Sequence, residues 1–406
     1  MLSGDRGEAL AMAMRILTKF ARVMGASELL DISAAHIDGC LVTGQSSLDL
    51  AEALRDRGGQ VAVPTTLNVS SLDLLHPELY RGDDEPRARQ LMQAYEDMGC
   101  QPTWTCAPYQ LEARPGFGDQ IAWAESNAIA FANSVLGART NRYGDFIDIC
   151  CALTGRAPAA GLHLDEHRLA QLVISVEHLP DRLLATDAFF PVLGFVIGTS
   201  VDTRVPAVVG IPQATEDQLK AMCAAAASAG SVGLIHVVGI TPEAPDLSTA
   251  LGNEPVAETI IVTASDVVHA RDRLSSGDAT ALSTVSLGTP HYSQAELATL
   301  LNMLAGRSVH ESIAMYVNTS RDVLGASGGI AAGLSDLGVQ LVTDTCTYIT
   351  PVMKPVTGVA MTDSAKWAYY APGNLGVDVA FASLSECVES AVAGQILRDS
   401  DMWGGL

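Results

Sequence analysis

Short apolar segments typical of strands alternate with amphipathic segments typical of helices along almost the whole chain. Residues 8–24 place apolar side chains at helical spacing, and residues 60–64 form a short apolar run that starts after two glycines and ends at a proline. Strands that alternate with helices favour parallel sheets covered by helices, because each helix returns the chain to the same edge of the sheet. The sequence therefore predicts an α/β fold in α/β/α layers with mostly parallel sheets.

The same pattern assigns the individual segments. The expected helices cover residues 8–24, 48–57, 85–98, 121–136, 215–229, 266–274, 293–305 and 328–337. The expected strands cover residues 29–33, 60–64, 103–106, 232–238, 259–263, 284–287 and 312–317. Residues 189–212 are apolar but interrupted by glycine and proline, which predicts either a buried crossover or a surface that docks a partner.

The length of the chain predicts more than one lobe. A chain of 406 residues with 48% apolar residues is too long for one simple core and apolar enough for several. Joints rich in proline and glycine fall near residues 154–161 and 240–255. We therefore expect three lobes, over residues 1–155, 156–250 and 251–406.

The formal net charge of −22 is spread along the chain. Such an acidic surface repels phosphate backbones and anionic lipids. No apolar run reaches the roughly 18–20 residues that a membrane span requires, and Arg6, Glu8 and Arg15 interrupt the first apolar stretch. We therefore expect a cytoplasmic protein that binds neither nucleic acid nor membrane and whose eight cysteines stay reduced.

Polar residues beside small ones follow several expected strands, which is where α/β proteins place their sites. His36 and Asp38 indicate either a turn that Asp38 caps or a histidine that binds a carboxylate or moves a proton. Residues 64–71, which include Thr66 and Asn68, offer hydroxyls and an amide. These groups predict either a cap for the next helix or contacts to a carboxylate.

The densest group of polar residues precedes the first expected lobe boundary. It begins with Glu125, Ser126 and Asn127 and continues with Arg139, Asn141 and Arg142. Guanidinium groups bind carboxylates bidentately, so the two arginines predict a clamp for a carboxylate substrate. The alternative is an ordinary internal ion pair with a nearby aspartate.

Widely spaced cysteines stand at or near the ends of expected strands, at Cys106, at Cys346 and at the pair 150–151. Neighbouring cysteines on one element point to different faces, so at most one of the pair is expected to be a ligand. No spacing typical of a zinc ribbon or a ferredoxin is present. Three dispersed thiolates can still hold an iron–sulfur cluster with one open iron, and the alternative is that they are packed core thiols.

Six segments carry a family resemblance. They are S-A-A-H-I-D-G at 33–39, V-P-T-T-L-N-V at 63–69, T-W-T-C-A-P-Y-Q at 103–110, W-A-E-S-N-A-I at 123–129, F-A-N-S-V-L-G-A-R-T-N-R-Y-G-D-F at 131–146 and D-T-C-T-Y at 344–348. Together they resemble the aconitase X family, and the similarity runs from about residue 7 to about residue 395. The run from 123 to 146 is the most specific part.

The resemblance implies a multi-lobed, aconitase-like α/β region that dehydrates a small hydroxy acid. Two activities are associated with the family, namely cis-3-hydroxy-L-proline dehydratase and mevalonate 5-phosphate dehydratase. Family members also carry a small swivelling domain, either fused or as a separate subunit. Because this chain resembles the large region alone, we expect a separate small subunit as its partner.

The resemblance further implies an iron–sulfur cluster and favours the hydroxyproline activity. The phosphomevalonate-type enzymes carry a cluster ligand in a G-C-P-H turn, where this chain has Thr289 in place of the cysteine. The hydroxyproline branch resembles this chain at that turn and carries a cluster of the 2Fe–2S type. The ligands that the resemblance implies are Cys106, Cys150 and Cys346.

The implied reaction removes water from cis-3-hydroxy-L-proline to give Δ1-pyrroline-2-carboxylate. Its weakly acidic C2 proton needs a positioned base, and its C3 hydroxyl needs a Lewis acid. We expect Lys366 or His36 to move protons, with a base from the small subunit as the alternative. The side chains expected to bind substrate are Thr66, Asn68, Ser126, Asn127, Arg139 and Asn141.

Two other functions stay open at this point. The same fold would dehydrate mevalonate 5-phosphate if it offered a phosphate site, for which Arg321 and the glycines at 328–329 are the candidates. The chain would instead be a non-catalytic scaffold if its cysteines were merely buried. A protein of the last kind would be free of iron.

Overall fold

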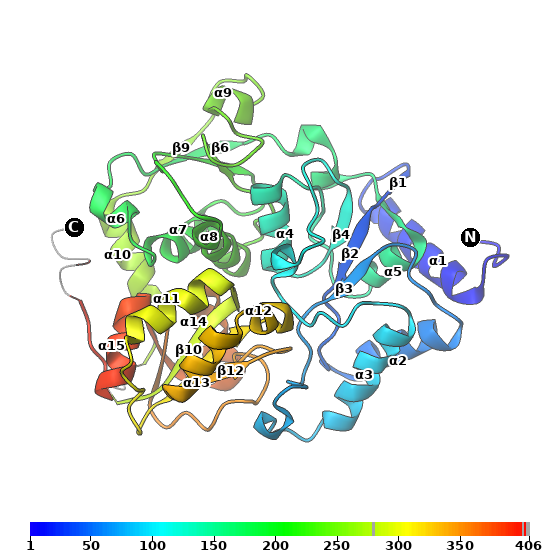
Figure 1. Cartoon of the computed structure of the whole chain (residues 1–406). Coiled ribbons are helices and arrows are strands. Elements are labelled where there is room, and N and C mark those ends of the chain that lie inside the picture. Colours follow the sequence, from blue (N-terminus) through cyan, green and yellow to red (C-terminus); the bar gives the residue numbers. More distant parts are fainter. Residues whose placement is uncertain (278–280, 400–401, 403–406) are drawn as a thin grey trace.

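A computed structural model describes residues 1–277, 281–399 and 402 (Figure 1). Its sheets are parallel with one exception, so the predicted α/β fold with mostly parallel sheets is confirmed. The exception is the short antiparallel pair β1 (Leu29–Asp31) and β5 (Arg156–Pro158). Among the described residues, no helix combines the length and the apolar character that a membrane crossing requires.

The first lobe contains a three-stranded parallel sheet in the order β3-β2-β4. Its strands are β2 (Ala34–Ile37), β3 (Thr65–Leu67) and β4 (Ile121–Trp123). Its helices are α1 (Glu8–Val23), α2 (Gln45–Asp56), α3 (Glu85–Asp97), α4 (Ser126–Phe131) and α5 (Ile147–Thr154). One apolar core joins residues of α1, α2, α3 and α5 to the sheet.

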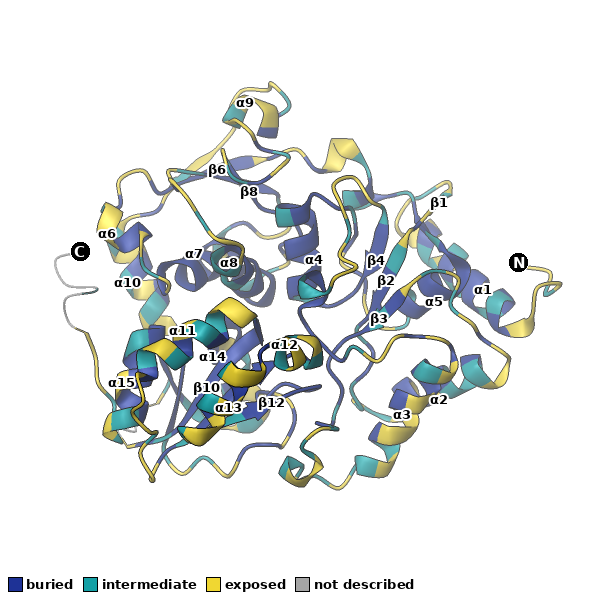
Figure 2. Cartoon of the chain, in the orientation of Figure 1, coloured by how far each residue is buried: buried dark blue, intermediate teal, exposed yellow. Residues whose placement is uncertain are grey.

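The middle lobe contains a four-stranded parallel sheet in the order β8-β7-β6-β9. Its strands are β6 (Leu172–Ser175), β7 (Pro206–Val209), β8 (His236–Val237) and β9 (Thr259–Ile261). Its helices are α6 (Asp181–Leu184), α7 (Phe189–Ser200), α8 (Glu216–Ala229), α9 (Leu247–Ala250) and α10 (Ala264–Arg273). Residues 189–198 of α7 are all buried (Figure 2), which confirms a buried crossover in this segment.

The third lobe contains a five-stranded parallel sheet in the order β12-β11-β10-β13-β14. Its strands are β10 (Leu282–Tyr292), β11 (Ala314–Thr319), β12 (Val339–Val342), β13 (Val359–Thr362) and β14 (Asp378–Phe381). Its helices are α11 (Gln294–Leu304), α12 (Arg321–Ala326), α13 (Gly328–Asp336), α14 (Ala365–Leu375) and α15 (Leu384–Ala393). Helix α14 lies towards the middle lobe and contacts α8.

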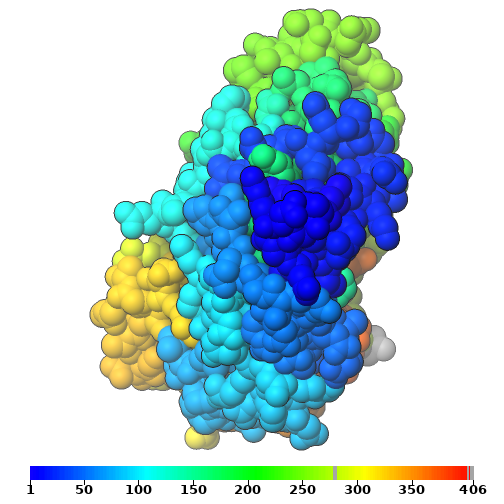
Figure 3. Space-filling view, turned by 90° about the vertical axis from the view of Figure 1, so that its right-hand side faces the viewer, coloured from blue at the N-terminus to red at the C-terminus, as the bar shows by residue number. Residues whose placement is uncertain are grey.

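The three lobes lie against one another, with the N-terminal residues on one side of the molecule and the middle and third lobes beside them (Figure 3). Strand β9 follows residue 250, where we placed the second boundary, yet it pairs with β6 of the middle sheet. Helix α10 contacts α7 of the same lobe. We therefore propose that the middle lobe extends to about the end of α10, beyond the boundary predicted from the sequence.

Three predicted segments differ from the structure. Residues 60–64 are not a strand, because the Val61 and Ala62 amides donate to the carbonyl oxygens of Met98 and Ala152 instead of a neighbouring strand. Residues 103–106 form a loop in which Trp104 has a φ of 43°. The predicted helix over 121–136 is β4 followed by α4, because the Glu125 carboxylate caps α4 by accepting from the Ala128 amide.

Candidate metal centre and neighbouring ion pair

The carboxyl ends of the first and third sheets carry the polar residues of one site. Glu125 follows β4, His291 lies near the end of β10, and Cys346 and Lys366 follow β12 and β13. Hydrogen bonds cross from sheet to sheet here, including one from the Ser70 amide to the Asp344 carbonyl oxygen (2.7 Å). Sites of α/β proteins form at such strand ends, because the loops after parallel strands meet there.

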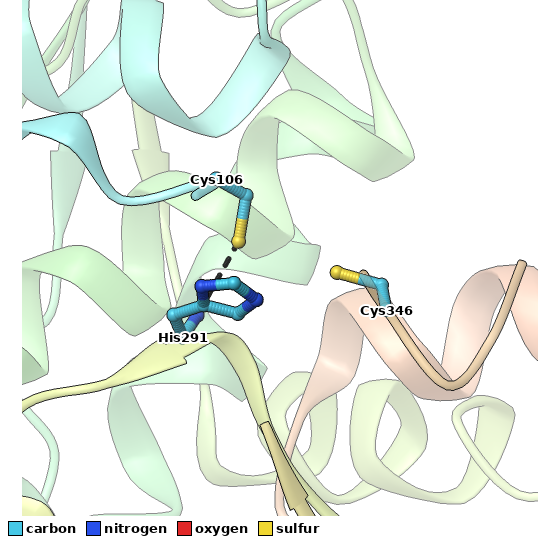
Figure 4. Close-up of side chains that lie close together, drawn as sticks. All are labelled: Cys106, His291 and Cys346. Atoms are coloured by element: carbon cyan, nitrogen blue, oxygen red, sulfur yellow. Dashed lines mark hydrogen bonds between the residues drawn. The ribbon is translucent and has the colours of Figure 1, made fainter. Parts of the chain in front are cut away.

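Cys106, His291 and Cys346 come together at this junction (Figure 4). Each offers one possible ligand atom, and these atoms lie within 4.8 Å of one another. All three residues are buried, with exposed fractions of 2%, 0% and 1%. The group combines two sulfur donors and one nitrogen donor from loops that are far apart in the sequence.

Local hydrogen bonds fix the loop that carries Cys106 and the end of β10 that carries His291. The Thr105 amide donates to the Leu67 carbonyl oxygen at the end of β3 (3.1 Å), which ties the Cys106 loop to the first sheet. The His291 amide donates to the Cys106 sulfur (3.3 Å), as the dashed line in Figure 4 shows. His291 is followed by Ser293, which caps α11, so its backbone stands where a strand turns into a helix.

The His291 ring is held between two threonine residues. Nε2 lies 3.2 Å from the Thr345 carbonyl oxygen, and Nδ1 lies 3.0 Å from the Thr105 hydroxyl. A carbonyl oxygen only accepts, so Nε2 donates to Thr345, and the Thr105 hydroxyl can donate to Nδ1. A metal at Nδ1 would take the place of the Thr105 hydroxyl, while the hydrogen bond from Nε2 to the carbonyl oxygen would orient the ring, as in metal-binding histidines.

The two sulfur atoms have opposite tendencies to ionise. Burial raises the pKa of Cys106, but the neighbouring Cys346 thiol and the nearby His291 and Lys366 side chains offset this and lower the pKa below its usual range. The same contact with Cys106, together with burial, raises the pKa of Cys346 well above its usual range. The pair therefore favours one thiolate and one thiol, and a bound cation would release the remaining proton.

The group fits a metal ion or an iron–sulfur cluster. A metal with bonds of about 2.0–2.3 Å separates its nitrogen and sulfur ligands by roughly 3.5–3.8 Å, so small shifts within the 4.8 Å group would suffice. Two cysteines and one histidine are donors that bind zinc and iron. Three donors also leave at least one coordination position free for a substrate oxygen.

Cys150, which the resemblance implied as the third ligand, lies elsewhere. It is in α5, fully buried in the apolar core of the first lobe with α1 and β2. Burial and the nearby Asp148 raise its pKa to about 12, the opposite of what a ligand thiolate needs. The structure brings His291, rather than Cys150, to the other two cysteines.

Lys366 and Glu125 form a buried ion pair close to this group. Their side chains are 3% and 6% exposed, and the Lys366 Nζ lies 6.0 Å from the centre of the Tyr348 ring. Burial lowers the pKa of Lys366, but the charges of Glu125, Tyr348 and Cys106 offset this and raise it well above its usual range. Lys366 is therefore a fixed cation beside the metal-binding group.

Asn127 links the ion pair to the Cys106 loop. Its amide nitrogen donates to the Glu125 carboxylate and to the Cys106 carbonyl oxygen (3.1 Å), and its oxygen accepts from the Tyr109 hydroxyl (2.7 Å). Ser126 is only partly buried, and its hydroxyl lies 3.5 Å from the Glu125 carboxylate. The structure thus places both residues at the site that the sequence predicted for them.

His36, Thr66 and Asn68 lie at the ends of β2 and β3. Nδ1 of His36 is 2.8 Å from the Thr66 hydroxyl, and burial lowers the pKa of His36 to about 3, so the ring is neutral. Asn68 donates to Asp38, whose pKa is raised well above its usual range by burial and by carboxylates that include Glu125. These residues adjoin the ion pair, but His36 is 0% exposed, and of its two ring nitrogens only Nδ1 has a hydrogen-bond partner among the described residues.

Arg139 and Asn141 point to another part of the molecule. Arg139 pairs with Asp165, and the Asn141 amide donates to the Ala160 carbonyl oxygen (2.8 Å). These contacts do not support the predicted carboxylate clamp. Arg142 is exposed, and its guanidinium donates to the main-chain oxygens of Ala227 (3.3 Å) and Val232 (2.9 Å).

Sequence reasoning thus missed two members of this site as functional groups. Glu125 lay in a segment that carries the family resemblance, but no role was assigned to it. A carboxylate at this position is also explained as the N-cap of a helix. His291 stood in the turn that carries Thr289, the residue that replaces a family cysteine, but it was not expected to be a ligand. A histidine two residues after a missing ligand is the signal that would have suggested a replacement donor.

Comparisons with known proteins agree with this fold. Models of the aconitase X first, second and third domains match residues 1–166, 170–272 and 282–393. The chain is 46% identical to a cis-3-hydroxy-L-proline dehydratase of Pseudomonas aeruginosa, over 99% of this chain and 70% of that protein. It is 32% identical to the phosphomevalonate dehydratase large subunit of Methanosarcina mazei, over 99% and 97% of the two chains.

A solved structure shows the same fold. The crystal structure of Thermococcus kodakaraensis aconitase X in its holo-form superposes with a TM-score of 0.86 at 31% identity. The match covers 96% of this chain and 97% of that chain. With three domain models in the order expected and a whole-chain structural match, the chain belongs to the aconitase X family.

Proposed function

We propose that this chain is the catalytic region of a hydro-lyase that removes water from cis-3-hydroxy-L-proline. The observation that carries the proposal is the buried Cys106–His291–Cys346 group beside the Lys366–Glu125 ion pair. The substrate is supported by relatives of that name in Pseudomonas aeruginosa and Hypocrea jecorina, at 46% and 42% identity. The phosphomevalonate dehydratase large subunits are less similar, at 28–35%.

The Cys106–His291–Cys346 group is the proposed site of an iron–sulfur cluster, for which the 2Fe–2S type is our proposal. Cys106 and Cys346 were expected ligands, and His291 is the donor that the geometry adds. Bound there, a cluster with an open iron would supply a Lewis acid for the departing hydroxyl group. Thr289 lies close to the group, and Ser364 donates to its carbonyl oxygen, so the turn is held without a third thiolate.

Lys366 is proposed to bind the substrate carboxylate and the negative charge that develops when the C2 proton leaves. A lysine whose pKa is raised keeps its proton, so it serves as a cation and cannot accept the C2 proton. A charge fixed in a buried site is effective because no solvent has to reorganise around it. Glu125 holds the ammonium in place.

His36 is proposed to position residues and not to move protons. Its ring is neutral and hydrogen-bonded to Thr66, which in turn adjoins Asn68. We propose that the base comes from the small swivelling subunit, since relatives that match this chain along 97% of their length are named large subunits. The proton and the hydroxyl group leave as water, and the enamine product then tautomerises.

The first test is the content of iron and acid-labile sulfide in protein purified without oxygen. We expect about two of each per chain, as a 2Fe–2S cluster requires. The loaded protein, mixed with its small subunit, is expected to dehydrate cis-3-hydroxy-L-proline faster than mevalonate 5-phosphate. Absence of iron and sulfide after anaerobic reconstitution, or the opposite order of substrates, would contradict the proposal.

A further inference from the structure

The backbone of His291 is a point where all three lobes meet. Its carbonyl oxygen accepts from Gln110 of the first lobe (3.2 Å) and from Lys220 of α8 in the middle lobe (3.4 Å). Its amide donates to the Cys106 sulfur (3.3 Å). A displacement of this one residue would therefore move both the imidazole donor and the hydrogen bond to the thiolate.

Lys220 is a buried lysine at the contact between α8 and α11. Its side chain is 3% exposed, and its ammonium donates to Asp217 (2.9 Å), to Glu296 and to the His291 carbonyl oxygen. All three N–H donors therefore have an acceptor. Burial lowers the pKa of Lys220, but Glu296 and Asp217 offset this and raise it, so the group stays charged.

The carboxylates that hold Lys220 are themselves bound to the turn after His291. Asp217 accepts from the Ser293 hydroxyl (2.8 Å), and Glu296 accepts from the Ser293 amide (2.7 Å). The ammonium, the two carboxylates and Ser293 thus clamp the first turn of α11 to α8. A buried ion pair is seldom better for stability than apolar residues of the same size, because both charges lose their hydration. The hydrogen bond from Lys220 to the His291 carbonyl oxygen suggests that the pair instead holds His291 in position.

We propose that Lys220 is a positioning residue that holds His291, and through it Cys106, in the geometry that binds metal. The inference rests on the proposed function, because it assumes that Cys106, His291 and Cys346 form the metal centre. Gln110 shares the task from the first lobe. Lys220 of the middle lobe then helps to fix the geometry of the metal centre, although no ligand belongs to that lobe.

Cobalt(II) alone is the probe for this inference, because thiolate-to-cobalt absorption reports the donors without any catalytic turnover. We would titrate Co²⁺ into the reduced, metal-free chain and compare Lys220→Met and Gln110→Leu with the unchanged chain. Residues behind metal ligands typically contribute 10–100-fold in affinity. We therefore expect the dissociation constant for Co²⁺ to rise at least about tenfold in Lys220→Met and by a smaller factor in Gln110→Leu.

The matched control is Glu243→Gln, which also removes one charge from a buried pair of the middle lobe. Glu243 binds Arg168 at 3.0 Å and is not bonded to His291, so we expect unchanged Co²⁺ affinity. Lys220→Met leaves two carboxylates without a cation and is expected to unfold more readily. Gln110→Leu leaves no charge unpaired, so it decides the matter if Lys220→Met does not fold.

The outcomes separate this inference from the proposed function. The positioning role would be overturned if Gln110→Leu bound Co²⁺ as tightly as the unchanged chain, and if Lys220→Met did so where it folds. The metal centre itself would then stay intact. Weakened binding in Glu243→Gln to the same extent would also overturn it, since the effect would then be general destabilisation. No thiolate-to-cobalt absorption in the unchanged chain would overturn the metal centre and the inference with it.

Discussion

At the scale of residues, burial alone does not identify the functional cysteines. Each of the eight cysteines is buried, yet their neighbours differ. Cys106 receives an amide hydrogen bond, and the neighbouring Cys346 thiol together with Lys366 lowers its pKa, whereas burial raises the pKa of Cys150 and Cys223 to about 12. A thiolate is the form that binds metal, so the surroundings of the sulfur decide its use.

Serine substitutions test this distinction. Cys106→Ser and Cys346→Ser are expected to lower iron content and Co²⁺ affinity by more than the roughly 10–100-fold seen for residues behind a ligand, because each removes a donor. Cys150→Ser and Cys223→Ser are expected to keep the iron content and the Co²⁺ affinity of the unchanged chain. Iron analysis and Co²⁺ titration measure the effect, and equal losses in Cys150→Ser and Cys106→Ser would restore Cys150 as the ligand.

Lys366 permits a second test at this scale. Lys366→Gln is expected to lower kcat about 10²–10³-fold, the range for removal of a preorganised charge from an active site. Iron content should stay unchanged, because Lys366 is not a donor. Exposed Lys354→Gln is the control and should have normal activity. Normal kcat in Lys366→Gln would exclude the residue from the reaction.

The sequence predicted part of this site and could not predict its pairings. Cys106, Cys346, Asn127 and Lys366 were all expected members, and the structure places them together. The Lys366–Glu125 ion pair joins residues 241 positions apart, and no local pattern records such a contact. Arg139 was expected to clamp a carboxylate because it stands in a polar segment, but the fold turns it towards another loop.

At the scale of elements, the strongest predictions concerned helices with clear caps. The expected helix over 293–305 is α11 (Gln294–Leu304), where Ser293 and Glu296 form a capping box. Short strands were less certain, since a run such as 60–64 bonds to helix ends instead of to a strand. Periodicity records which face is buried, whereas strand pairing depends on distant partners.

The contact between α7 and α8 leads to a prediction at this scale. A Cβ added at Gly194 would lie 2.2 Å from the Met222 carbonyl oxygen, which the helix cannot move easily. Gly194→Ala is therefore expected to lower the free energy of unfolding by about 1–3 kcal/mol, the usual cost of overpacking. The control is Gly325→Ala in α12, where nothing lies within 4 Å and no loss is expected.

Urea denaturation of both variants would measure this difference, because the midpoint reports stability where the slope is unchanged. Helix propensity alone favours alanine over glycine in either helix, so a loss at Gly194 must come from the close approach of the two helices. Equal stability of the two variants would show that α7 and α8 can separate at no cost.

At the scale of the whole molecule, the first and third lobes are joined by a second set of buried bonds. Asp73 of the first lobe accepts from the Thr343 amide (2.8 Å) and hydroxyl (2.9 Å) of the third lobe. Asp344 accepts from the Leu74 amide (3.0 Å) and pairs with Arg321. Since Cys106 and Cys346 belong to these two lobes, this junction also holds the two sulfur donors together.

His76 makes this junction dependent on pH. It lies 2.9 Å from the Asp73 carboxylate, and that hydrogen bond raises the pKa of His76. Burial opposes ionisation of Asp73, but the bonds from His76 and Thr343 lower its pKa overall. A raised histidine pKa stabilises the folded state fully below the unfolded value of about 6.5, and this stability is lost as the pH rises through the folded value. A lowered aspartate pKa stabilises the folded state above about pH 3.9, and this stability is lost as the pH falls through the folded pKa of Asp73.

His76→Gln should therefore destabilise the chain most between about pH 4 and 6.5 and least above the folded pKa of His76. Urea denaturation at pH 6 and at pH 9 measures how far the free energy of unfolding of His76→Gln differs from that of the unchanged chain. His178→Gln, at an exposed histidine, is the control. A difference that grows from pH 6 to pH 9 would contradict the proposed pairing. The expected decrease would mean that protonation of His76 tightens the junction of the lobes that carry the two cysteines.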